Sequence, residues 1–367
     1  MDLNSLRDLY PAPFPNNVPI ADIQKLSLKK LLDDDPIETQ KMFDILSGVG
    51  FFYLDMMDHE KGRKLWEDAC TAARSGMEVF PHTPLAEKRD YKAPKGVKVL
   101  DRGYQVGAVN EDGTPRDSEM FMIPQHEMLG FGKSDWTLPG WLAKHEERFQ
   151  NALRSGNVIA NVVLGVLEKK LQLAPGTFTS LHRLTDSSGD FLRVIRYPGS
   201  KDVSRVDPLR FPPHKDAVSV AILFTWLGGL QMIAPDAPVG LNQFMIPDEH
   251  WRWIKPLPGT ALINLGEAME IFTNGVLKAG MHRIVKAPGD QIYHDKYSVL
   301  LVARPEANTP MKAFESPMIP PPTADQAKAP VYNSFEWGNR RIQQLQDFID
   351  GLQTRRAGKE AKLERSW

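Results

Sequence analysis

The sequence predicts an α+β fold with a mainly β core, a barrel or double-sheet jelly roll, wrapped by N-terminal helices and closed by a C-terminal helix. Three observations support this prediction. Up to residue 185, the longest periodic stretches repeat apolar residues at helical spacing. From residue 191, short β-rich runs alternate with Pro and Gly turns, as in antiparallel all-β cores. A last stripe of helical spacing begins near residue 336.

We therefore treat residues 1–367 as one domain with three parts. Residues 1–185 form the helical wrap, residues 186–305 form the β core with the metal site argued below, and residues 306–367 form a linker and the closing helix. Hydrophobic residues make up 42% of the chain, which is the usual globular proportion, and a chain of this length can bury a large core.

The N-terminal part is expected to consist mainly of helices. The strongest helical pattern covers residues 142–171, although Gly156 and Asn157 are candidates for a break in it. Residues 60–79 form a second helix and residues 37–48 a third, which Gly48 ends. The other elements expected here are a short strand over 18–22, a helix over 23–32, a buried strand over 50–54, and loops or short hairpins over 88–117.

The β core is expected to contain six short strands. They cover residues 191–197, 217–225, 230–234, 261–265, 282–286 and 297–303. A Pro-rich linker at 317–322 then leads to a helix over 336–362. The apolar stripe of that helix needs a partner surface, so we expect the helix to cover part of the mouth of the core. The stripe consists of Ile342, Leu345, Phe348, Ile349 and Leu352.

Composition excludes several classes of protein. The net charge is -1, so no basic field indicates nucleic acid or an anionic membrane as a partner. No apolar run approaches the roughly 20 residues that span a bilayer. Cys70 is the only cysteine, which excludes an intramolecular disulfide and a Cys-rich zinc or iron–sulfur site. With no signal peptide or lipidation motif in the sequence, we expect a cytoplasmic protein with no obligate protein partner.

Two histidines and one aspartate form the candidate metal site. His214 and Asp216 are two residues apart, so on a strand they would share one face. His282 opens a later β-rich run and is the natural third ligand. Two histidines and one carboxylate are typical of a facial triad, which leaves neighbouring positions on a metal open for dioxygen and substrate. The remaining histidines lie in charged turns or in the helical half, and no zinc-protease helix, Walker loop or nucleophile elbow is present.

Five motifs occur in a fixed order along residues 18–305. In this order they resemble the iron(II)/2-oxoglutarate dioxygenases of the isopenicillin N synthase-like group. They are Gly-Phe-Phe-Tyr-Leu at 50–54, Arg-Val-Ile-Arg-Tyr-Pro at 193–198, His-Lys-Asp at 214–216, Gly-Gly-Leu-Gln at 228–231, and a final segment with Ala-Leu-Ile-Asn-Leu-Gly at 261–266, Thr-Asn-Gly at 273–275 and His-Arg at 282–283.

The resemblance implies a double-stranded β-helix, a distorted jelly roll, wrapped by N-terminal helices. It implies that His214, Asp216 and His282 bind Fe(II), with 2-oxoglutarate as cosubstrate and dioxygen as oxidant. Tyr197 falls where a tyrosine of this family contacts the carboxylate of the cosubstrate or substrate.

One motif departs from the family pattern. The family usually carries Arg-x-Ser on a late strand to hold the distal carboxylate of 2-oxoglutarate, and here the position reads Lys296-Tyr-Ser298. Lysine supplies a point charge without the bidentate fork of arginine, and the serine hydroxyl can still donate. We therefore expect Lys296 and Ser298 to bind the cosubstrate, with Arg304 or Arg283 as substitutes. Arg283 is the weaker substitute because its neighbour His282 must face the metal.

The resemblance further implies oxidation of a C–H bond of a small molecule of specialised metabolism, by hydroxylation, desaturation or cyclisation. Two alternatives stay open: a 2-oxoglutarate-independent non-haem iron oxidase like isopenicillin N synthase, and a non-catalytic binding protein on the same fold. Release of succinate distinguishes the 2-oxoglutarate-dependent oxygenase from both alternatives. The candidates for lining an apolar substrate pocket, each equally interpretable as ordinary core, are Leu223, Met232, Ile284 and Trp337.

Overall fold

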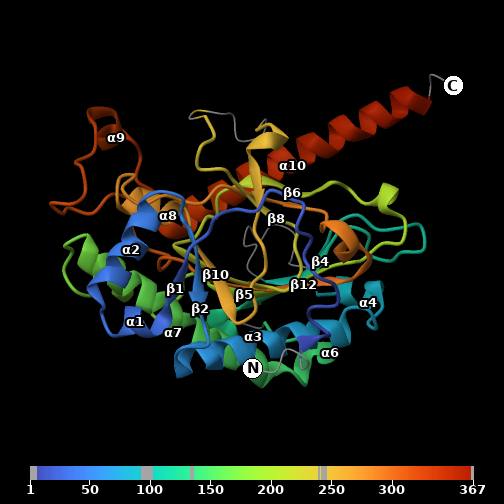
Figure 1. Ribbon diagram of the computed structural model, residues 1–367, viewed down its shortest axis with the longest axis horizontal. Coiled ribbons are helices and arrows are strands. Elements are labelled where there is room, and N and C mark those ends of the chain that lie inside the picture. Colours follow the sequence, from blue (N-terminus) through green and yellow to red (C-terminus); the bar gives the residue numbers. More distant parts are fainter. Residues whose placement is uncertain (1–5, 92–101, 133–135, 239, 241–245, 365–367) are drawn as a thin grey trace.

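The computed structural model describes residues 6–91, 102–132, 136–238, 240 and 246–364, which form two β-sheets with helices packed outside them (Figure 1). The larger sheet has eight strands in the order β1-β2-β10-β7-β12-β5-β4-β3. Its strands are β1 (Lys25–Ser27), β2 (Phe51–Asp55), β3 (Gly103–Val106), β4 (Glu119–Pro124), β5 (Phe191–Tyr197), β7 (Val220–Thr225), β10 (Thr260–Leu265) and β12 (Lys296–Ala303).

The smaller sheet has four strands in the order β6-β11-β8-β9. They are β6 (Leu209–His214), β8 (Leu230–Ile233), β9 (Trp251–Trp253) and β11 (His282–Val285). A buried apolar cluster includes Phe51 and Leu262 of the large sheet and Leu230 and Met232 of the small one, so the two sheets share an interior. This confirms the predicted α+β fold with a mainly β core.

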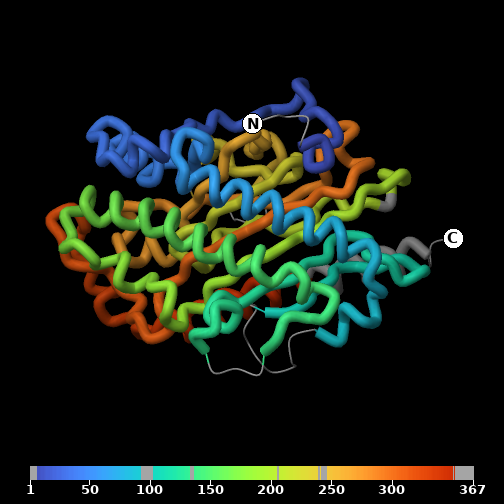
Figure 2. The backbone as a smooth tube through the Cα atoms, turned by 90° about the horizontal axis from the view of Figure 1, so that it is seen from below, coloured from blue at the N-terminus to red at the C-terminus, as the bar shows by residue number. Residues whose placement is uncertain are grey.

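Ten α-helices lie in the described part of the chain. Figure 2 shows the two longest N-terminal helices, α3 and α7, running side by side beneath the sheets. The helices are α1 (Leu28–Leu32), α2 (Pro36–Ser47), α3 (Glu60–Val79), α4 (Leu85–Arg89), α5 (Gln125–Met128), α6 (Gly140–Ala143), α7 (Glu146–Lys170), α8 (Glu267–Phe272), α9 (Ala324–Lys328) and α10 (Ser334–Glu364).

Glycines let the two long helices approach the large sheet closely. A Cβ at Gly76 of α3 would lie 2.7 Å from Cγ1 of Val194, and a Cβ at Gly156 of α7 would lie 2.6 Å from Cδ2 of Leu301. Both distances are too short for real carbon atoms, so a larger residue would force the contacting side chain or the helix to shift. Gly156 therefore marks the contact of α7 with the sheet, and the helix continues through it without the break considered above.

The other expected helices and strands mostly match the structure. The helix over 60–79 has the predicted bounds, and the stretches 37–48 and 50–54 match α2 and β2 to within one residue at each end. Each of the six runs of the expected β core overlaps a strand. The loop expected over 88–117 contains β3 and ends just before β4, while residues 92–101 lie outside the described residues.

Two expectations near the N-terminus are wrong. The helix expected over 23–32 is helical only at Leu28–Leu32, because Lys25–Ser27 pairs in parallel with β2 as strand β1. The strand expected over 18–22 is reduced to a single bridge between Ile20 and Trp253. At Lys25–Ser27 pairing with a distant strand overrides the local helical pattern, whereas residues 18–22 pair with β9 at one position only.

Helix α10 packs against the core with its first turns and then extends away from the body of the molecule (Figure 1). Trp337 is 9% exposed and belongs to the main hydrophobic cluster. Ile342, Leu345 and Phe348 face a cavity of the β core, as the apolar stripe predicted, whereas the side chain of Leu352 lies outside the described residues. Within the described residues, no helix is both long and apolar enough to cross a membrane.

Candidate metal centre and adjoining cavity

Three side chains converge where the small sheet meets the large one. His214 ends β6, His282 begins β11, and the two are register partners in the antiparallel pair. Their ring centroids are 4.2 Å apart. Asp216 follows in the link that leads from β6 in the small sheet to β7 in the large sheet. Residues distant in sequence therefore meet because the chain crosses between sheets at this point.

The ligand atoms of these side chains lie close enough to share a metal ion. Nε2 of His214 is 3.6 Å and Nε2 of His282 is 3.9 Å from Oδ1 of Asp216. One such atom from each residue can be chosen so that all three lie within 4.8 Å of one another. Among the described residues, no second group of three or more His, Cys, Asp or Glu side chains meets this condition.

Backbone carbonyls fix the orientation of both imidazoles. Nδ1 of His214 lies 2.9 Å from the carbonyl oxygen of Pro212, and Nδ1 of His282 lies 3.0 Å from that of Gly280. A carbonyl oxygen only accepts, so each Nδ1 must carry the proton and each Nε2 keeps its lone pair. Burial, and then the nearby His282, holds the pKa of His214 below its ordinary value, which keeps this ring neutral.

Asn264 orients the carboxylate of Asp216. Nδ2 of Asn264 donates to Oδ2 of Asp216 at 2.8 Å, which leaves Oδ1 directed at the histidines. The backbone N–H of Glu267 also donates to the Asp216 carbonyl at 2.9 Å. Burial alone would raise the pKa of Asp216, but the positive charges that His282 and His214 carry when protonated, and the Asn264 hydrogen bond, outweigh burial and lower the pKa. The carboxylate is therefore ionised.

This donor set fits a divalent transition metal. Two neutral imidazoles and one carboxylate form the ligand set of the facial triad, which suits Fe(II) and leaves positions open on one side. In each of the three side chains, a hydrogen bond holds the polar atom that does not face the other two residues, as is usual for metal-binding His and Asp residues.

The expectation that His214 and Asp216 share one face of a strand is wrong. The two were expected on one face of a strand, but β6 ends at His214 and β7 begins only at Val220. Asp216 lies in irregular backbone, where alternation does not apply. The carboxylate reaches the histidines because the link enters the interior on its way between the sheets.

Three further predicted residues lie together on the large sheet. Lys296 and Tyr197 are register partners in the pair of β12 with β5, and Nζ of Lys296 lies 5.1 Å from the centre of the Tyr197 ring. Ser298 lies two residues along β12 on the same face as Lys296, with its Oγ 3.0 Å from Oγ1 of Thr225. The side chains expected to bind the cosubstrate therefore gather on one face.

Lys296 is a buried cation without an acceptor. The residue is 6% exposed and has no hydrogen-bond or ion-pair partner among the described residues. Burial, and then the charge of Arg210, lowers the pKa of Lys296 to about 7. A charge in such a place is costly unless an anion joins it. The position therefore fits the carboxylate of a bound molecule.

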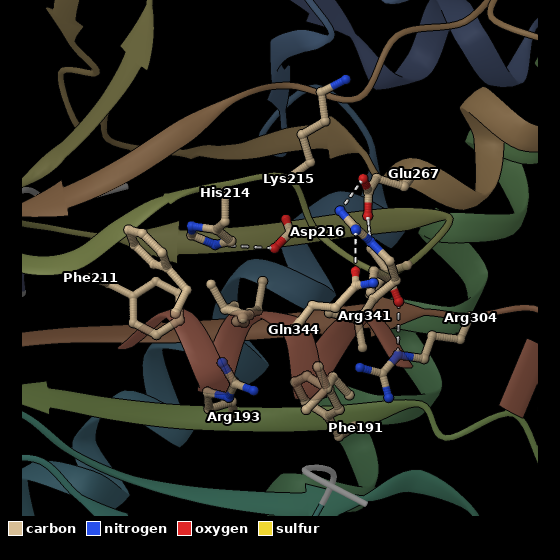
Figure 3. Close-up of a pocket in the computed structure, with 17 residues that line it drawn as sticks. Phe191, Arg193, Phe211, His214, Lys215, Asp216, Glu267, Arg304, Arg341 and Gln344 are labelled. Atoms are coloured by element: carbon tan, nitrogen blue, oxygen red, sulfur yellow. Dashed lines mark hydrogen bonds and ion pairs between the residues drawn. The ribbon is translucent and has the colours of Figure 1, made fainter. Parts of the chain in front are cut away.

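A cavity of about 320 Å³ adjoins the candidate metal site formed by His214, Asp216 and His282, and its wall includes His214 and Asp216. Figure 3 shows these residues on one side of the cavity and Arg193 on the other, with Arg341 and Glu267 paired near its rim. The apolar lining consists of Phe191, Phe211, Ala217, Val218, Leu300, Val302, Ile342, Leu345 and Phe348. The polar lining adds Arg193, Lys215, Glu267, Arg304, Arg341 and Gln344.

The four residues expected to line a substrate pocket lie elsewhere. Met232, Leu223 and Ile284 belong to the apolar cluster that joins the two sheets, and Trp337 belongs to the main cluster. None of the four lines the cavity beside the candidate metal site. Their contact with a substrate stays a prediction, whereas their packing in the core is plain.

The two substitute arginines have different surroundings. Arg283 faces away from the candidate metal site, as alternation predicted, and binds Gln231 and Asp248. Arg304 lines the cavity, and its guanidinium donates to the backbone carbonyls of Ala217 and Gly189. Lys296 is therefore better placed than either to receive a carboxylate beside Tyr197.

Sequence reasoning missed two residues of the site. Asn264 is the one polar residue between Ala261 and Leu265 of a buried strand, and that contrast could have indicated a special role. Arg193 precedes Tyr197 by four residues on β5, so alternation could have placed both on the inner face.

Comparisons with known proteins agree with this geometry. Residues 188–305 match the model of the 2OG-Fe(II) oxygenase superfamily. A 2-oxoglutarate-dependent dioxygenase of Aspergillus fumigatus is 44% identical over 352 residues, which cover 94% of this chain and 91% of that protein. A second, from Gibberella zeae, is 25% identical over 81% of this chain and 83% of its own length.

Solved structures show the same fold. A full-length Neurospora crassa protein in complex with alpha-KG and thymine has a TM-score of 0.70 and 18% identity, covering 90% of this chain and 98% of that one. JOX2 in complex with 2OG, Fe and JA has a TM-score of 0.62 and 21% identity, covering 92% and 91%. The implied double-stranded β-helix is thereby confirmed.

Proposed function

We propose that this chain, which belongs to the 2OG-Fe(II) oxygenase superfamily, holds Fe(II) with His214, Asp216 and His282 and oxidises a C–H bond of a small organic molecule. Its activity is that of an Fe(II)/2-oxoglutarate-dependent dioxygenase. The observation that carries the ligand assignment is the convergence of two Nε2 atoms and Oδ1 of Asp216, with every other polar atom of these side chains already hydrogen-bonded.

Bound Fe(II), with 2-oxoglutarate and dioxygen, supplies the oxidising power for C–H cleavage, while 2-oxoglutarate is converted to succinate and carbon dioxide. The chain itself holds the ligands in one orientation and keeps the His214 imidazole neutral. The closing helix α10 contributes Leu345 and Phe348 to the cavity wall, so it limits the access of water to the reacting atoms.

We assign the distal carboxylate of 2-oxoglutarate to Lys296 and Ser298, with Tyr197 beside it. The support is the buried, unpartnered ammonium of Lys296 on the face that also carries Ser298. A hydroxyl group can rotate, so Ser298 can exchange its contact with Thr225 for one with the carboxylate. This anchor also favours a 2-oxoglutarate-dependent enzyme over a 2-oxoglutarate-independent oxidase, because the oxidase would provide no carboxylate to pair with Lys296.

The substrate class proposed is a small molecule of specialised metabolism. A cavity of about 320 Å³ with mostly apolar walls admits a molecule of one or two rings. The solved structures support this size, since the similarly folded Neurospora crassa protein holds thymine, a single-ring molecule. Hydroxylation, desaturation and cyclisation are all consistent with this cavity.

The test is a screen of small organic molecules with the Fe(II)-loaded protein, 2-oxoglutarate and dioxygen. We expect at least one molecule to change mass by an oxidation while an equal amount of succinate is released. Consumption of dioxygen with oxidation of a substrate in the complete absence of 2-oxoglutarate would overturn the cosubstrate assignment. It would support the hypothesis of a 2-oxoglutarate-independent oxidase.

A further inference from the structure

We propose that the substrate carries a planar anionic group, a carboxylate, on an apolar body, and that Arg193 binds this group. The inference rests on the proposed function, since it concerns the substrate of the same cavity. It goes further by naming the charge that the substrate must carry and the residue that selects for it.

Arg193 has almost none of its hydrogen-bonding capacity used. Its Nε is shielded from solvent and has no hydrogen-bond partner in the described part of the chain. The hydrogen bond that the described residues do give it runs from a terminal nitrogen to the weak acceptor Sδ of Met122, at 3.2 Å. The guanidinium also lies 4.7 Å from the Phe191 ring centre, which leaves its edge open toward the cavity. A guanidinium has five N–H donors, so most are unmatched here.

The other cations around this cavity are matched by groups of the protein. Arg341 forms a bidentate pair with Glu267, at 2.6 and 2.7 Å. Lys215 binds both oxygens of Glu270 at 2.8 and 2.9 Å. Arg304 donates to two backbone carbonyls. Arg193 therefore brings a positive charge without a strong protein acceptor into a cavity where the other cations already bind acceptors of the protein, which favours a bound anion.

Strand register separates Arg193 from the cosubstrate anchor. Tyr197 pairs with Lys296, whereas Arg193, four residues before Tyr197 on β5, pairs with Leu300, four residues after Lys296 on β12. At 3.3 Å per residue the two backbone positions are roughly 13 Å apart on one inner face. Lys296 and Arg193 are thus well separated along this face, so they suit two different anions better than the same carboxylate.

The walls near Arg193 define the rest of the ligand. Phe191, Leu300 and Val302 lie on the same face of the sheet as Arg193, and Phe211, Leu345 and Phe348 complete an apolar enclosure. Such walls accept rings or short aliphatic chains, while the arginine fork orients a carboxylate bidentately. Binding one end of the ligand at Arg193 would direct a C–H bond of its apolar body at the metal.

The experiment measures binding of matched acids and amides to the anaerobic Fe(II)–2-oxoglutarate protein by calorimetric titration. The probes are phenylacetate, 3-phenylpropanoate and 1-naphthoate, each with its primary amide. We expect the wild type to bind at least one acid about 10- to 100-fold more tightly than its amide. Arg193→Gln should abolish this preference, and Arg193→Lys should restore only part of it, because lysine lacks the fork.

The double variant Arg341→Gln/Glu267→Gln is the matched control, because it removes another arginine of the same cavity together with the carboxylate that it pairs with, so no new charge is left unpaired. We expect it to leave the acid-to-amide ratio unchanged, even if all affinities shift together. Equal binding of acids and amides by the wild type, or failure of every acid to bind, would overturn the proposal. So would an Arg341→Gln/Glu267→Gln variant that loses the preference as fully as Arg193→Gln.

The visible charge-transfer band of the Fe(II)–2-oxoglutarate complex, recorded in the same samples, separates the two levels of the argument. A protein that shows the band but ranks acids and amides equally refutes the role of Arg193 and keeps the proposed function. A protein that prefers acids but never shows the band refutes the proposed binding of 2-oxoglutarate to iron and keeps the role of Arg193 in binding a carboxylate. If Arg193→Gln weakens 2-oxoglutarate as much as the acids, Arg193 serves the cosubstrate and the substrate assignment fails.

Discussion

Asn264 holds one oxygen of Asp216 and leaves the other directed at the two histidines. Its neighbours on β10 are apolar and buried, so no other side chain of that strand can take over the bond. Without the amide, the carboxylate could rotate, and Oδ2 would lack a partner in a buried place. Asn264 therefore positions the carboxylate of Asp216 and is not itself a candidate metal ligand.

We predict that Asn264→Ala lowers the affinity for Fe(II) by about 10- to 100-fold, the range typical of partners that orient a metal ligand. The measurement is competition between the apoprotein and a chelator of known affinity. Asn161→Ala is the control, because Asn161 is a partly buried asparagine of α7 that binds Asn157. An Asn264→Ala protein with wild-type metal affinity would show that Asp216 is oriented by other contacts.

Lys296 leads to a second prediction at the scale of single residues. A charge-assisted hydrogen bond in a partly dry site contributes about 1.5–3 kcal/mol, so Lys296→Met should weaken 2-oxoglutarate binding by roughly 10- to 150-fold. Lys296→Arg need not restore it, because the longer fork enters a space shaped for lysine. Iron affinity should barely change, and an unaltered affinity for 2-oxoglutarate would move the anchor to Arg304.

The pH dependence follows from the same residue. The pKa of Lys296 in the free protein is lowered to about 7, and a bound carboxylate raises it again. Protonated lysine is the binding form, so 2-oxoglutarate affinity should be highest below pH 7 and fall as the pH rises above it. Titrations between pH 6 and pH 9 test this, with Lys296→Met as the variant that should show no such slope.

At the scale of elements, α10 completes the cavity wall from outside the β core. Ile342, Leu345 and Phe348 line the cavity, while Arg341 binds Glu267 at the start of α8. Trp337 anchors the first turns of the helix in the main cluster. The helix therefore contributes both to the packing of the fold and to the wall of the cavity.

We predict that truncation after Pro330 lowers the melting temperature and raises KM. Burial of one large apolar side chain contributes roughly 1.5–3 kcal/mol, and the truncation removes Trp337 together with the residues that line the cavity. Truncation after Gly351 is the control, because it keeps every described α10 residue of the cavity wall. Unchanged melting and turnover after the longer deletion would contradict the role given to α10.

Strands and helices differ in how well the sequence predicted them. The helix at residues 60–79 and the strand at 191–197 were predictable to the residue, because long amphipathic or apolar runs carry their own pattern. Strand β6 was not predicted, since Pro212 and Pro213 in it are typical of loops. The structure places β6 at an edge of the small sheet, where prolines cost few hydrogen bonds.

At the scale of the whole molecule, the position of the candidate metal site depends on how the two sheets are joined. His214 and His282 belong to the small sheet, Asn264 to the large one, and Asp216 to the link between them. Ordered motifs in the sequence could indicate the triad, because they depend on residue type and order. The cavity wall could not be predicted in the same way, because Arg193, Phe211 and Phe348 meet only after the sheets and α10 have packed.

The central claim is that His214, Asp216 and His282 together hold the iron on which 2-oxoglutarate binds. The most direct test titrates Fe(II) and then 2-oxoglutarate into the anaerobic protein, recording metal content and the visible charge-transfer band for the wild type and Asp216→Ala. We predict one iron and a clear band for the wild type, and neither for Asp216→Ala, with closely similar melting temperatures. Wild-type iron content and turnover in Asp216→Ala, after chelation and reloading, would contradict the account.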